Sequence, residues 1–337
     1  DILFFWVARM IMAGKHYTGK APFKNVYLTG IVRDKQGRKM SKSLGNSPDP
    51  LDLIAQYGAD GVRVGMLLCS PAGNDLPFDE RLCEQGRNFS NKLWNAFRLI
   101  QGWEVVDGAL EENRVAVDWF RNRLNQVMAE LEDDFVKFRL SEALMKVYKL
   151  VWDDFCAWYL EMVKPAYQQP IDAKSYQATL NFFENILKLI HPFMPFISEE
   201  LWHDEVFEKR GELECCIVAP YPNVGAIDLA ITKDFESIQQ VISEIRNIRN
   251  TKQLSPKDPL YLQIKANSGI KYQRYEAIIS KLANIAQISF ISDKPAGAAA
   301  FMAGTDEFFV PLSENIDAEA EKERITKELD YLNGFLK

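Results

Sequence analysis

Apolar residues recur every three or four positions through the middle of the chain, a period typical of helices that bury one face. Asp79 is placed to cap the first of these helices, which we expect to end near Gln101. Pro192 and Pro195 break or kink the last one, and a further helix is expected over about 234–252. The clearest apolar stripes are Phe89/Leu93/Phe97/Ile100, Phe120/Leu124/Val127/Leu131, Leu144/Val147/Val151/Phe155/Trp158/Met162 and Leu180/Phe183/Ile186/Leu187/Ile190. Long amphipathic helices with short connections predict a bundle.

The period differs near the N-terminus. Residues 5–13 have helical spacing, and Gly14 is expected to end that helix. Alternating apolar positions from Val26 to Val32 then predict a half-buried strand. Pro50 stands near the start of the next predicted helix.

Beyond Leu260 the pattern alternates again. A strand at 260–264, a helix through 275–282, a strand at 288–291 and a hairpin joining 299–302 to 308–312 predict a small βαββ module. Ile325, Leu329, Leu332 and Leu336 have the 4-3-4 spacing of a coiled-coil seam, which an ordinary amphipathic helix would fit equally well.

Composition narrows the class of protein. The chain has 337 residues, 47% of them hydrophobic, and no apolar run of about 18 residues, so we expect buried cores and no membrane span. The net charge of −7 argues against a nucleic-acid partner unless a local basic face exists. Five cysteines without a Cys-x-x-Cys pair indicate reduced thiols in a cytoplasmic protein. Three scattered histidines predict no protein-bound metal.

The segment Gly37–Asn46 carries the strongest chemistry. Lys39 and Lys42 lie three residues apart, the hydroxyl residues Ser41 and Ser43 flank Lys42, and glycines bracket the segment. In a non-helical loop both ammonium groups can reach one polyphosphate, where they would stabilise the charge that develops as pyrophosphate leaves. A solvated basic turn is the alternative.

The string Lys-Met-Ser-Lys-Ser at 39–43 resembles the signature loop of class I aminoacyl-tRNA synthetases. Residues 1–10, 87–96 and 311–321 are similar to the valyl-tRNA synthetase family, whereas 191–202 is shared with isoleucyl and leucyl enzymes. The resemblance covers nearly the whole chain. An isoleucyl- or leucyl-type fragment and a non-catalytic tRNA-binding module remain as alternatives.

This resemblance implies valine, ATP with Mg²⁺, and tRNA(Val) as substrates. It implies that Lys42 is catalytic and that Lys39 assists it. The implied ATP contacts are Lys39, Met40, Ser41, Lys42, Ser43, Gly30 and Ile31. Met40 is expected to anchor the loop in an apolar pocket, and Trp6 to form a wall of the amino-acid pocket.

The family's second signature, His-Ile-Gly-His, is absent, and His16-Tyr17-Thr18-Gly19 is no substitute for it. Since about half of the active site would then be missing, we expect the chain to be a piece of a larger protein and inactive alone. The expected whole is a cytoplasmic monomer that does not associate with membranes.

Three groups of residues are candidates for RNA contact. The first is Arg87, Asn91 and Asn95 with Trp94 beside them; the second is Arg246, Arg249 and Lys252 with Asn250; the third is Arg121 and Arg123. Arginine, asparagine and an aromatic ring suit phosphates and unpaired bases. For each group the alternative is a solvated helix face or hydrogen bonds between helices.

The predicted fold is mainly α with α/β parts, in five segments. These are the end of a Rossmann catalytic domain with the lysine loop (1–45), a connecting helical region (46–110), a helical anticodon-binding bundle (111–255), a small α/β module (256–315) and the start of a coiled coil (316–337).

Overall fold

The computed structural model describes residues 2–69, 74–108, 111–207, 210–211, 213–295 and 297–312, without the side chains of 111 and 112. The predicted coiled-coil segment, 316–337, lies outside these residues. Within the described part of the chain, no helix is long and apolar enough to cross a membrane.

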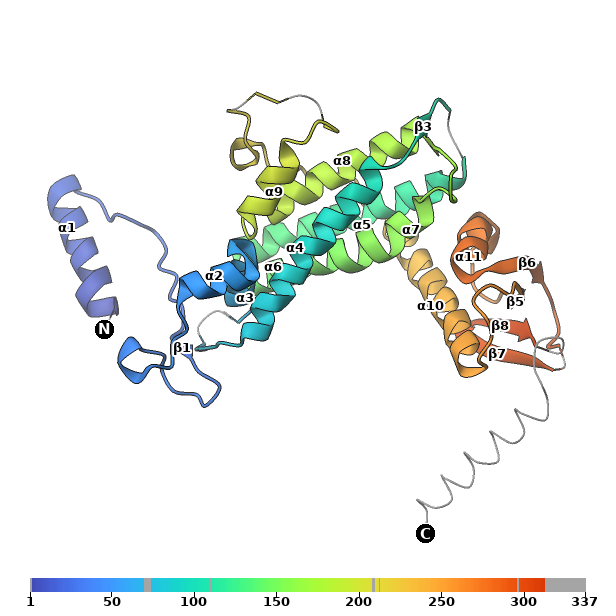
Figure 1. The fold of residues 1–337 in the computed structure, drawn as a ribbon, viewed down its shortest axis with the longest axis horizontal. Helices are drawn as coiled ribbons and strands as arrows, with labels where there is room; N and C mark the ends of the chain where they lie inside the picture. The colour runs from blue at the N-terminus through green and yellow to red at the C-terminus, as the bar shows by residue number, and fades with distance from the viewer. Residues whose placement is uncertain are drawn as a thin grey trace, which may run out of the picture. The chain divides into compact units, whose positions relative to one another are not determined.

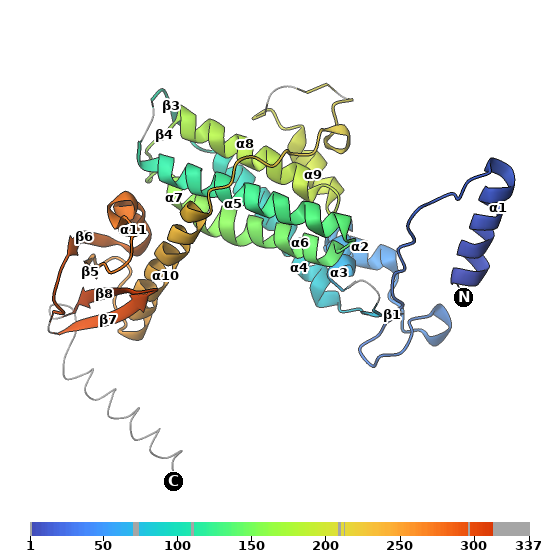
Figure 2. The same ribbon diagram turned by 180° about the vertical axis from the view of Figure 1, so that it is seen from behind.

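The middle of the chain forms a bundle of helices (Figures 1 and 2). Its members are α4 (Glu80–Gln101), α5 (Glu111–Val136), α6 (Leu140–Lys149) with its continuation through the π-helical η3 (Leu150–Tyr159) into α7 (Leu160–Val163), α8 (Ala173–Ile190) and α9 (Pro195–Trp202). The predicted helices and their apolar stripes are confirmed. Phe89, Leu93 and Ile100 are fully buried on α4. Asp79 accepts a hydrogen bond from the Arg81 N–H (3.0 Å), as expected of a cap.

Aromatic pairs hold the bundle core together. On α4, the Phe97 ring lies 5.6 Å from Phe183 of α8. On α5, the Phe120 ring lies 5.2 Å from Phe155 of η3 and 5.1 Å from Phe182 of α8. Such ring pairs add to the free energy gained by burying apolar area.

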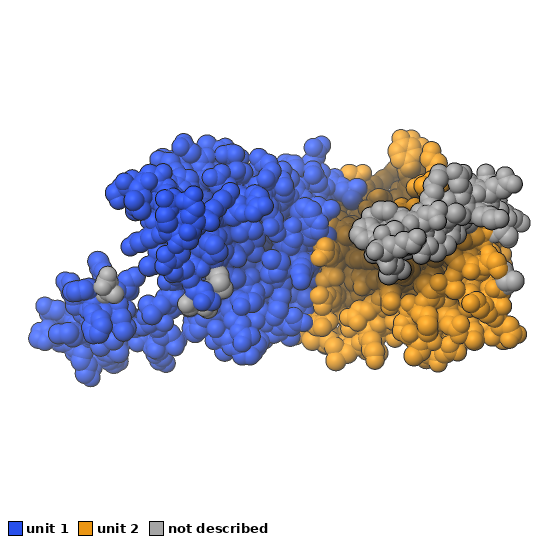
Figure 3. Space-filling view, turned by 90° about the horizontal axis from the view of Figure 1, so that it is seen from below, with its two compact units in different colours: residues 1–99, 127–152, 183–223 blue, residues 100–126, 153–182, 224–337 orange. Residues whose placement is uncertain are grey.

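The chain divides into two compact units, coloured in Figure 3. Unit 1 comprises residues 1–99, 127–152 and 183–223, and unit 2 comprises 100–126, 153–182 and 224–337. Each unit takes part of α5, part of the α6–η3–α7 helix and part of α8. The five-segment organisation inferred above stays a prediction.

The N-terminal helix is longer than the sequence suggested. η1 (Leu3–Ala8) continues into α1 (Arg9–Thr18), so the prediction that Gly14 ends it is wrong. The helix ends at Gly19, whose φ of 72° is the left-handed conformation that glycine adopts without strain. Gly14 keeps helical geometry, because a glycine weakens a helix by only about 1 kcal/mol relative to alanine.

The predicted strand from Val26 is much shorter. Only β1 (Val32–Arg33) is extended and paired, in parallel with β2 (Leu76–Pro77). Val26 and Leu28 are exposed. A strand needs a neighbour for its N–H and C=O groups; β2 and the returning hairpin arm at Lys39 pair with Val32 and Arg33, and no described strand pairs with residues 26–30. After β1 come the short 3-10 turn η2 (Lys42–Leu44), α2 (Pro50–Tyr57) and α3 (Ala59–Leu68).

Unit 2 ends in a small α/β module. α10 (Leu229–Thr251) begins five residues before the predicted start, because Asp228 caps it by accepting from the Ala230 N–H (2.9 Å). The strands β5 (Leu260–Lys265), β6 (Ile285–Phe290), β7 (Ala298–Ala303) and β8 (Asp306–Pro311) form one sheet in the order β6-β5-β8-β7. α11 (Glu276–Ala283) connects the parallel pair β5/β6, and β7/β8 is an antiparallel hairpin. The order along the chain is β-α-β-β-β; the helix and hairpin are as expected, and the hairpin brings one strand more than the predicted βαββ module counts. A further short parallel pair joins β3 (Val105–Val106) to β4 (Ile171–Asp172).

Candidate functional site

The lysine loop starts as a tight hairpin. After β1, the Asp34 N–H donates to the Arg38 carbonyl and the Gly37 N–H donates to the Asp34 carbonyl, both at 2.9 Å. Gly37 has a φ of 76°, which the turn requires. The Met40 N–H then donates back to the Val32 carbonyl at 2.9 Å. Lys39 therefore lies on the returning arm of the hairpin.

The second lysine starts a helical turn. Ser41 Oγ accepts from the Leu44 N–H (3.3 Å) and lies 3.1 Å from Ser43 Oγ. Lys42 is the first residue of η2, which ends at Gly45 with a φ of 63°. The expectation of a non-helical loop is therefore correct for Lys39 and wrong for Lys42, since Ser41 acts as an N-cap and nucleates a 3-10 turn.

Asp34 and Asn46 close the loop like a clasp. Asn46 Nδ2 donates to Asp34 Oδ2 (2.9 Å) and to the Lys39 carbonyl (3.3 Å). Asn46 Oδ1 accepts from the Ser41 N–H (2.9 Å). We call these contacts the Asp34–Asn46 clasp. They tie both flanks of the lysine segment to the hairpin turn and fix the backbone between the two lysines.

Donors converge on the Asp34 carboxylate. Besides the Asn46 amide, it accepts from the N–H groups of Gln36 (3.0 Å) and Arg38 (2.9 Å) and from Arg38 Nε (2.8 Å). The Asn46 hydrogen bond is the largest cause that holds the pKa of Asp34 far below its usual value; desolvation opposes it, and the Arg38 and Gln36 donors lower the pKa further. The clasp therefore carries an ionised carboxylate at neutral pH.

One side chain of the loop is anchored in an apolar cluster, and its two lysines are exposed. Met40 packs against a buried cluster of Leu53, Phe78 and Cys83, as expected for an anchor. Lys39 and Lys42 are exposed. An anchored backbone with free ammonium groups lets the lysines meet a ligand without reorganising the loop.

The backbone before the loop is closely packed. A Cβ on Gly30 would lie 1.7 Å from the Asn74 carbonyl oxygen, so the chain itself requires a glycine there. The Ile31 N–H donates to Asp75 Oδ1 (3.1 Å), and the Ile31 carbonyl accepts from the Leu76 N–H (2.9 Å). The N–H of Ile31 is thus already used, and a nucleotide contact by Ile31 would involve its exposed side chain.

Known proteins match both halves of the chain. Residues 1–79 match the model of tRNA synthetases class I (I, L, M and V), and residues 118–265 match the anticodon-binding domain of tRNA ligase. Over its full length the chain is 56% identical to the valine–tRNA ligase of Parabacteroides distasonis and 55% identical to that of Bacteroides thetaiotaomicron. The chain belongs to the valine–tRNA ligase family. The corresponding identity to the Fusobacterium nucleatum ligase is 39%.

The chain spans 38% of the length of the first two relatives and 40% of the third. Among solved structures, a LeuRS of Agrobacterium radiobacter K84 aligns with 67% of this chain and 27% of its own, at 20% identity and a TM-score of 0.49, a likeness too low to carry an argument. The match to valine–tRNA ligases favours the valine interpretation over the isoleucyl or leucyl alternative.

In this ligase-family chain the candidate pocket residue Trp6 lies on η1. Its side chain is 63% exposed, whereas the next residue, Val7, is buried. Its role as a wall of the amino-acid pocket stays a prediction.

The first RNA candidate group forms one face of α4. Arg87, Asn91 and Asn95 follow each other at four-residue spacing, and Trp94 beside them is 41% exposed. Arg87 is partly engaged, because Nη2 lies 3.5 Å from Glu84 and the guanidinium lies over the Tyr57 ring. The face is accessible to a ligand.

The second group does not form the expected basic face. Arg249 is only 6% exposed, and its guanidinium donates to the carbonyls of Ser255, Asp258, Ala283 and Asn284 at 2.7–3.1 Å. The prediction that Arg249 binds tRNA is wrong for this reason. The missed indication was the stripe Ile238/Val241/Ile242/Ile245 on α10, which continues onto position 249.

The rest of that group is more accessible. Arg246 is exposed at the surface, although it donates to the Leu282 carbonyl (2.9 Å) and lies over the Trp158 ring. Lys252 is half-buried at the end of α10. These two residues remain candidates for RNA contact.

In the third group, both arginines pair with acids. Arg121 contacts Asp118 (3.0 Å), and Arg123 Nε donates to Asp154 Oδ2 (2.8 Å). Desolvation raises the pKa of Asp154 in spite of Arg123. Arg123 is thereby committed to neutralising a largely buried carboxyl.

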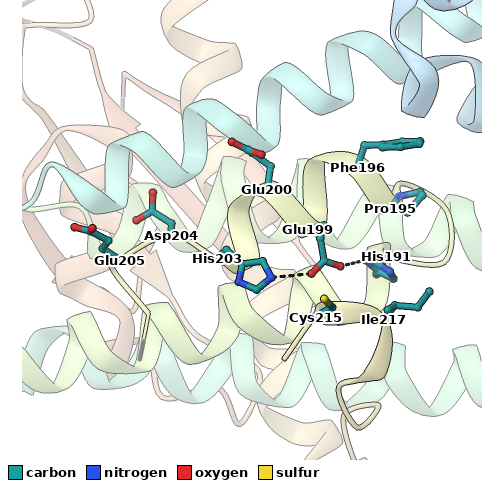
Figure 4. A pocket seen from close by; sticks show the side chains of 10 residues that line it. All are labelled: His191, Pro195, Phe196, Glu199, Glu200, His203, Asp204, Glu205, Cys215 and Ile217. Atoms are coloured by element: carbon teal, nitrogen blue, oxygen red, sulfur yellow. Dashed lines mark ion pairs between the residues drawn. The ribbon is translucent and has the colours of Figure 1, made fainter. Parts of the chain in front are cut away.

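The structure also brings together a cluster of potential metal ligands that the sequence analysis did not predict. Glu199, His203 and Cys215 lie together in a hollow of about 710 Å³, with His191 beside them (Figure 4). The four-residue spacing of Glu199 and His203 on one helix was the available indication, but Cys215 could be placed only by the fold.

Proposed function

We propose that this chain is part of a cytoplasmic, monomeric valine–tRNA ligase that joins valine to tRNA(Val) through valyl-adenylate. The observation that carries the proposal is the lysine loop, with two exposed ammonium groups on a backbone fixed by the Asp34–Asn46 clasp and by Met40. Full-length similarity to valine–tRNA ligases supports the choice of amino acid.

In the proposed reaction the valine carboxylate attacks the α-phosphorus of ATP, which enters as its Mg²⁺ complex. A P–O bond to the α-phosphorus forms, the bond to the bridging oxygen breaks, and pyrophosphate leaves. Negative charge then grows on the β- and γ-phosphate oxygens. Lys42, assisted by Lys39, would contact these oxygens more strongly in the transition state than in the ground state.

Other loop residues act through position. Ser41 and Ser43 offer hydroxyl groups close to the lysines, and Gly30 and Ile31 would lie against adenine. The clasp supplies preorganisation, because a donor that is already in place needs no reordering during the reaction. Further along, the bundle over 118–265 would bind the anticodon region of tRNA, as its match to an anticodon-binding domain suggests.

The decisive test is Lys42→Ala in the full-length ligase, measured by valine-dependent ATP–pyrophosphate exchange. Loss of one preorganised contact costs about 3 kcal/mol, so the rate of activation should fall about a hundredfold with little change in ATP affinity. Lys35→Ala is the matched control, since Lys35 is an exposed lysine in the turn of the same hairpin. It should leave the rate unchanged.

A large loss of ATP affinity at an unchanged rate would show that Lys42 contributes only ground-state binding. Exchange driven by isoleucine or leucine in preference to valine would overturn the assignment of the amino acid. Absence of exchange with all three would overturn the enzyme proposal.

A further inference from the structure

Three metal-ligand side chains converge at the end of α9. Glu199 lies on the helix and His203 caps its C-terminus, so their four-residue spacing puts both on one side. Cys215 comes from the segment that leads into the 3-10 turn η4 (Cys216–Val218). One ligand atom from each residue lies within 4.8 Å of the other two (Figure 4).

Hydrogen bonds hold the cysteine segment against the helix. The Cys216 N–H donates to Glu199 Oε1 (2.8 Å), and Trp202 Nε1–H donates to the Glu214 carbonyl (2.8 Å). These bonds flank Cys215 on both sides in the sequence. The backbone of Cys215 is therefore held beside α9, and rotation about the Cα–Cβ bond sets how closely the thiol approaches Glu199.

The surroundings are acidic. Besides Glu199, the hollow is lined by Glu200, Asp204 and Glu205. Carboxylates on the rim raise the local concentration of cations. His203 Nε2 lies 3.2 Å from Glu199 Oε1, so the imidazole and the carboxylate face each other across the site.

We propose that Glu199, His203 and Cys215 bind one Zn²⁺ ion, with solvent from the open hollow as the fourth ligand. Thiolate, imidazole and carboxylate are the ligand set of zinc, whereas Mg²⁺ and Ca²⁺ take oxygen ligands. Metal–ligand bonds of 2.0–2.3 Å set ligand atoms about 3.4 Å apart in a tetrahedron. The ligand atoms now lie within 4.8 Å of one another. Side-chain rotation has to shorten these separations by at most about 1.4 Å to reach the tetrahedral value.

Binding is balanced by proton loss. The Cys215 thiol gives its proton to solvent as it becomes a thiolate, and neutral His203 presents Nε2 to the ion by carrying its proton on Nδ1. No redox partner is needed. The site is independent of the lysine loop and of the proposed reaction, and it departs from the expectation, drawn from scattered histidines, that the chain binds no metal.

The test uses the 337-residue chain after treatment with a chelator and a reductant. Calorimetric titration should show one Zn²⁺ per chain at micromolar affinity or tighter. Co²⁺ should give the visible bands of a tetrahedral site and a near-ultraviolet thiolate-to-cobalt charge-transfer band. Cys215→Ala should remove that charge-transfer band and weaken Zn²⁺ binding at least about tenfold.

The matched controls are Cys216→Ala and Glu200→Gln, which change the neighbouring thiol and carboxylate. Cys216→Ala should keep the charge-transfer band and the Zn²⁺ affinity. Glu200→Gln should keep the band and weaken Zn²⁺ binding by less than about twofold, because it removes one rim charge and no ligand; Glu200 is exposed, so its variant serves even where loss of the buried Cys216 disturbs folding. Absence of stoichiometric binding, equal affinity in Cys215→Ala, or octahedral cobalt spectra without the charge-transfer band would each overturn the proposal.

Discussion

Burial decides what each cationic side chain of this molecule does. Lys42 and Lys39 are exposed on an anchored loop and are free to meet phosphate. Arg249 has the same charge, but it is buried at the end of an apolar stripe and is surrounded by backbone carbonyls. A guanidinium supplies five N–H donors in a fixed plane, which suits a junction where several chain segments end. Arg249 therefore joins α10 to the loop before β5 and to the end of α11.

Replacing Arg249 should loosen unit 2. Arg249→Ala leaves four carbonyls without their charged donor, at a cost of about 3 kcal/mol. We expect amide hydrogen exchange in β5 and α11 to accelerate about a hundredfold. Asn250→Ala, an exposed neighbour on the same helix, is the control and should leave exchange unchanged. Unchanged exchange in Arg249→Ala would return this residue to the candidates for tRNA contact.

At the scale of elements, the sequence predicted what local periodicity encodes. The stripes on α4, α5 and α8 and the alternation of strands and helix in the small module follow from residues that are neighbours along the chain. The prediction of a strand from Val26 was wrong. Alternating apolar residues show only that a segment can form a strand, whereas the strand itself also needs a partner to pair with. The prediction that Gly14 ends the first helix was wrong as well. The helix ends at Gly19, where the backbone takes a positive φ, and the residue type alone does not show which glycine does so.

Only part of the candidate site could be predicted from the sequence. The lysine loop and the anchoring role of Met40 could be inferred from the string of residues. The Asp34–Asn46 clasp could not, because a hairpin turn brings together side chains that are twelve positions apart. The cluster of Glu199, His203 and Cys215 also depends on tertiary structure.

The clasp has a measurable electrostatic consequence. The pKa of Asp34 in the folded loop lies below its ordinary value of 3.8, so the clasp contributes its stability above about pH 4 and loses it as the pH falls through the folded pKa. Asn46→Ala removes the largest cause of this shift and should raise the pKa of Asp34 toward 3.8. Carboxyl ¹³C NMR between about pH 6 and pH 3 would follow the titration.

Asn91→Ala, a change of the same type on α4, is the control for that titration. The clasp assignment would be contradicted if Asp34 titrated near 3.8 in the unaltered chain, or if Asn46→Ala left its pKa unchanged. At pH 6–8 the carboxylate is ionised throughout, so we expect no pH dependence of the lysine loop from Asp34 in that range.

At the scale of the whole molecule, the net charge is −7, so any contact with RNA has to come from a local basic face. Ion pairs consume much of the positive charge: Arg123 is held by Asp154, and Lys146 lies 2.7 Å from buried Asp134. With Arg249 buried as well, the face of α4 is the best remaining candidate within the described residues. RNA binding would then depend on few phosphate contacts, and it should be weak and sensitive to salt.

Arg87→Ala tests that face directly. If Arg87 contacts a phosphate of tRNA(Val), its loss should reduce the slope of log affinity against log salt by about 0.7 to 0.9, because one fewer counterion is released on binding. Fluorescence anisotropy of labelled tRNA(Val) with the 337-residue chain, at several salt concentrations, measures the slope. Arg81→Ala is the matched control: Arg81 is an exposed arginine of the same helix, but it points about 120° away from Arg87 around the helix axis and is paired with Asp79. The proposal would be overturned if the slope stayed the same in Arg87→Ala, or if it were reduced equally in both variants. The α4 face would then be ordinary solvated surface, with Arg87 paired only with Glu84.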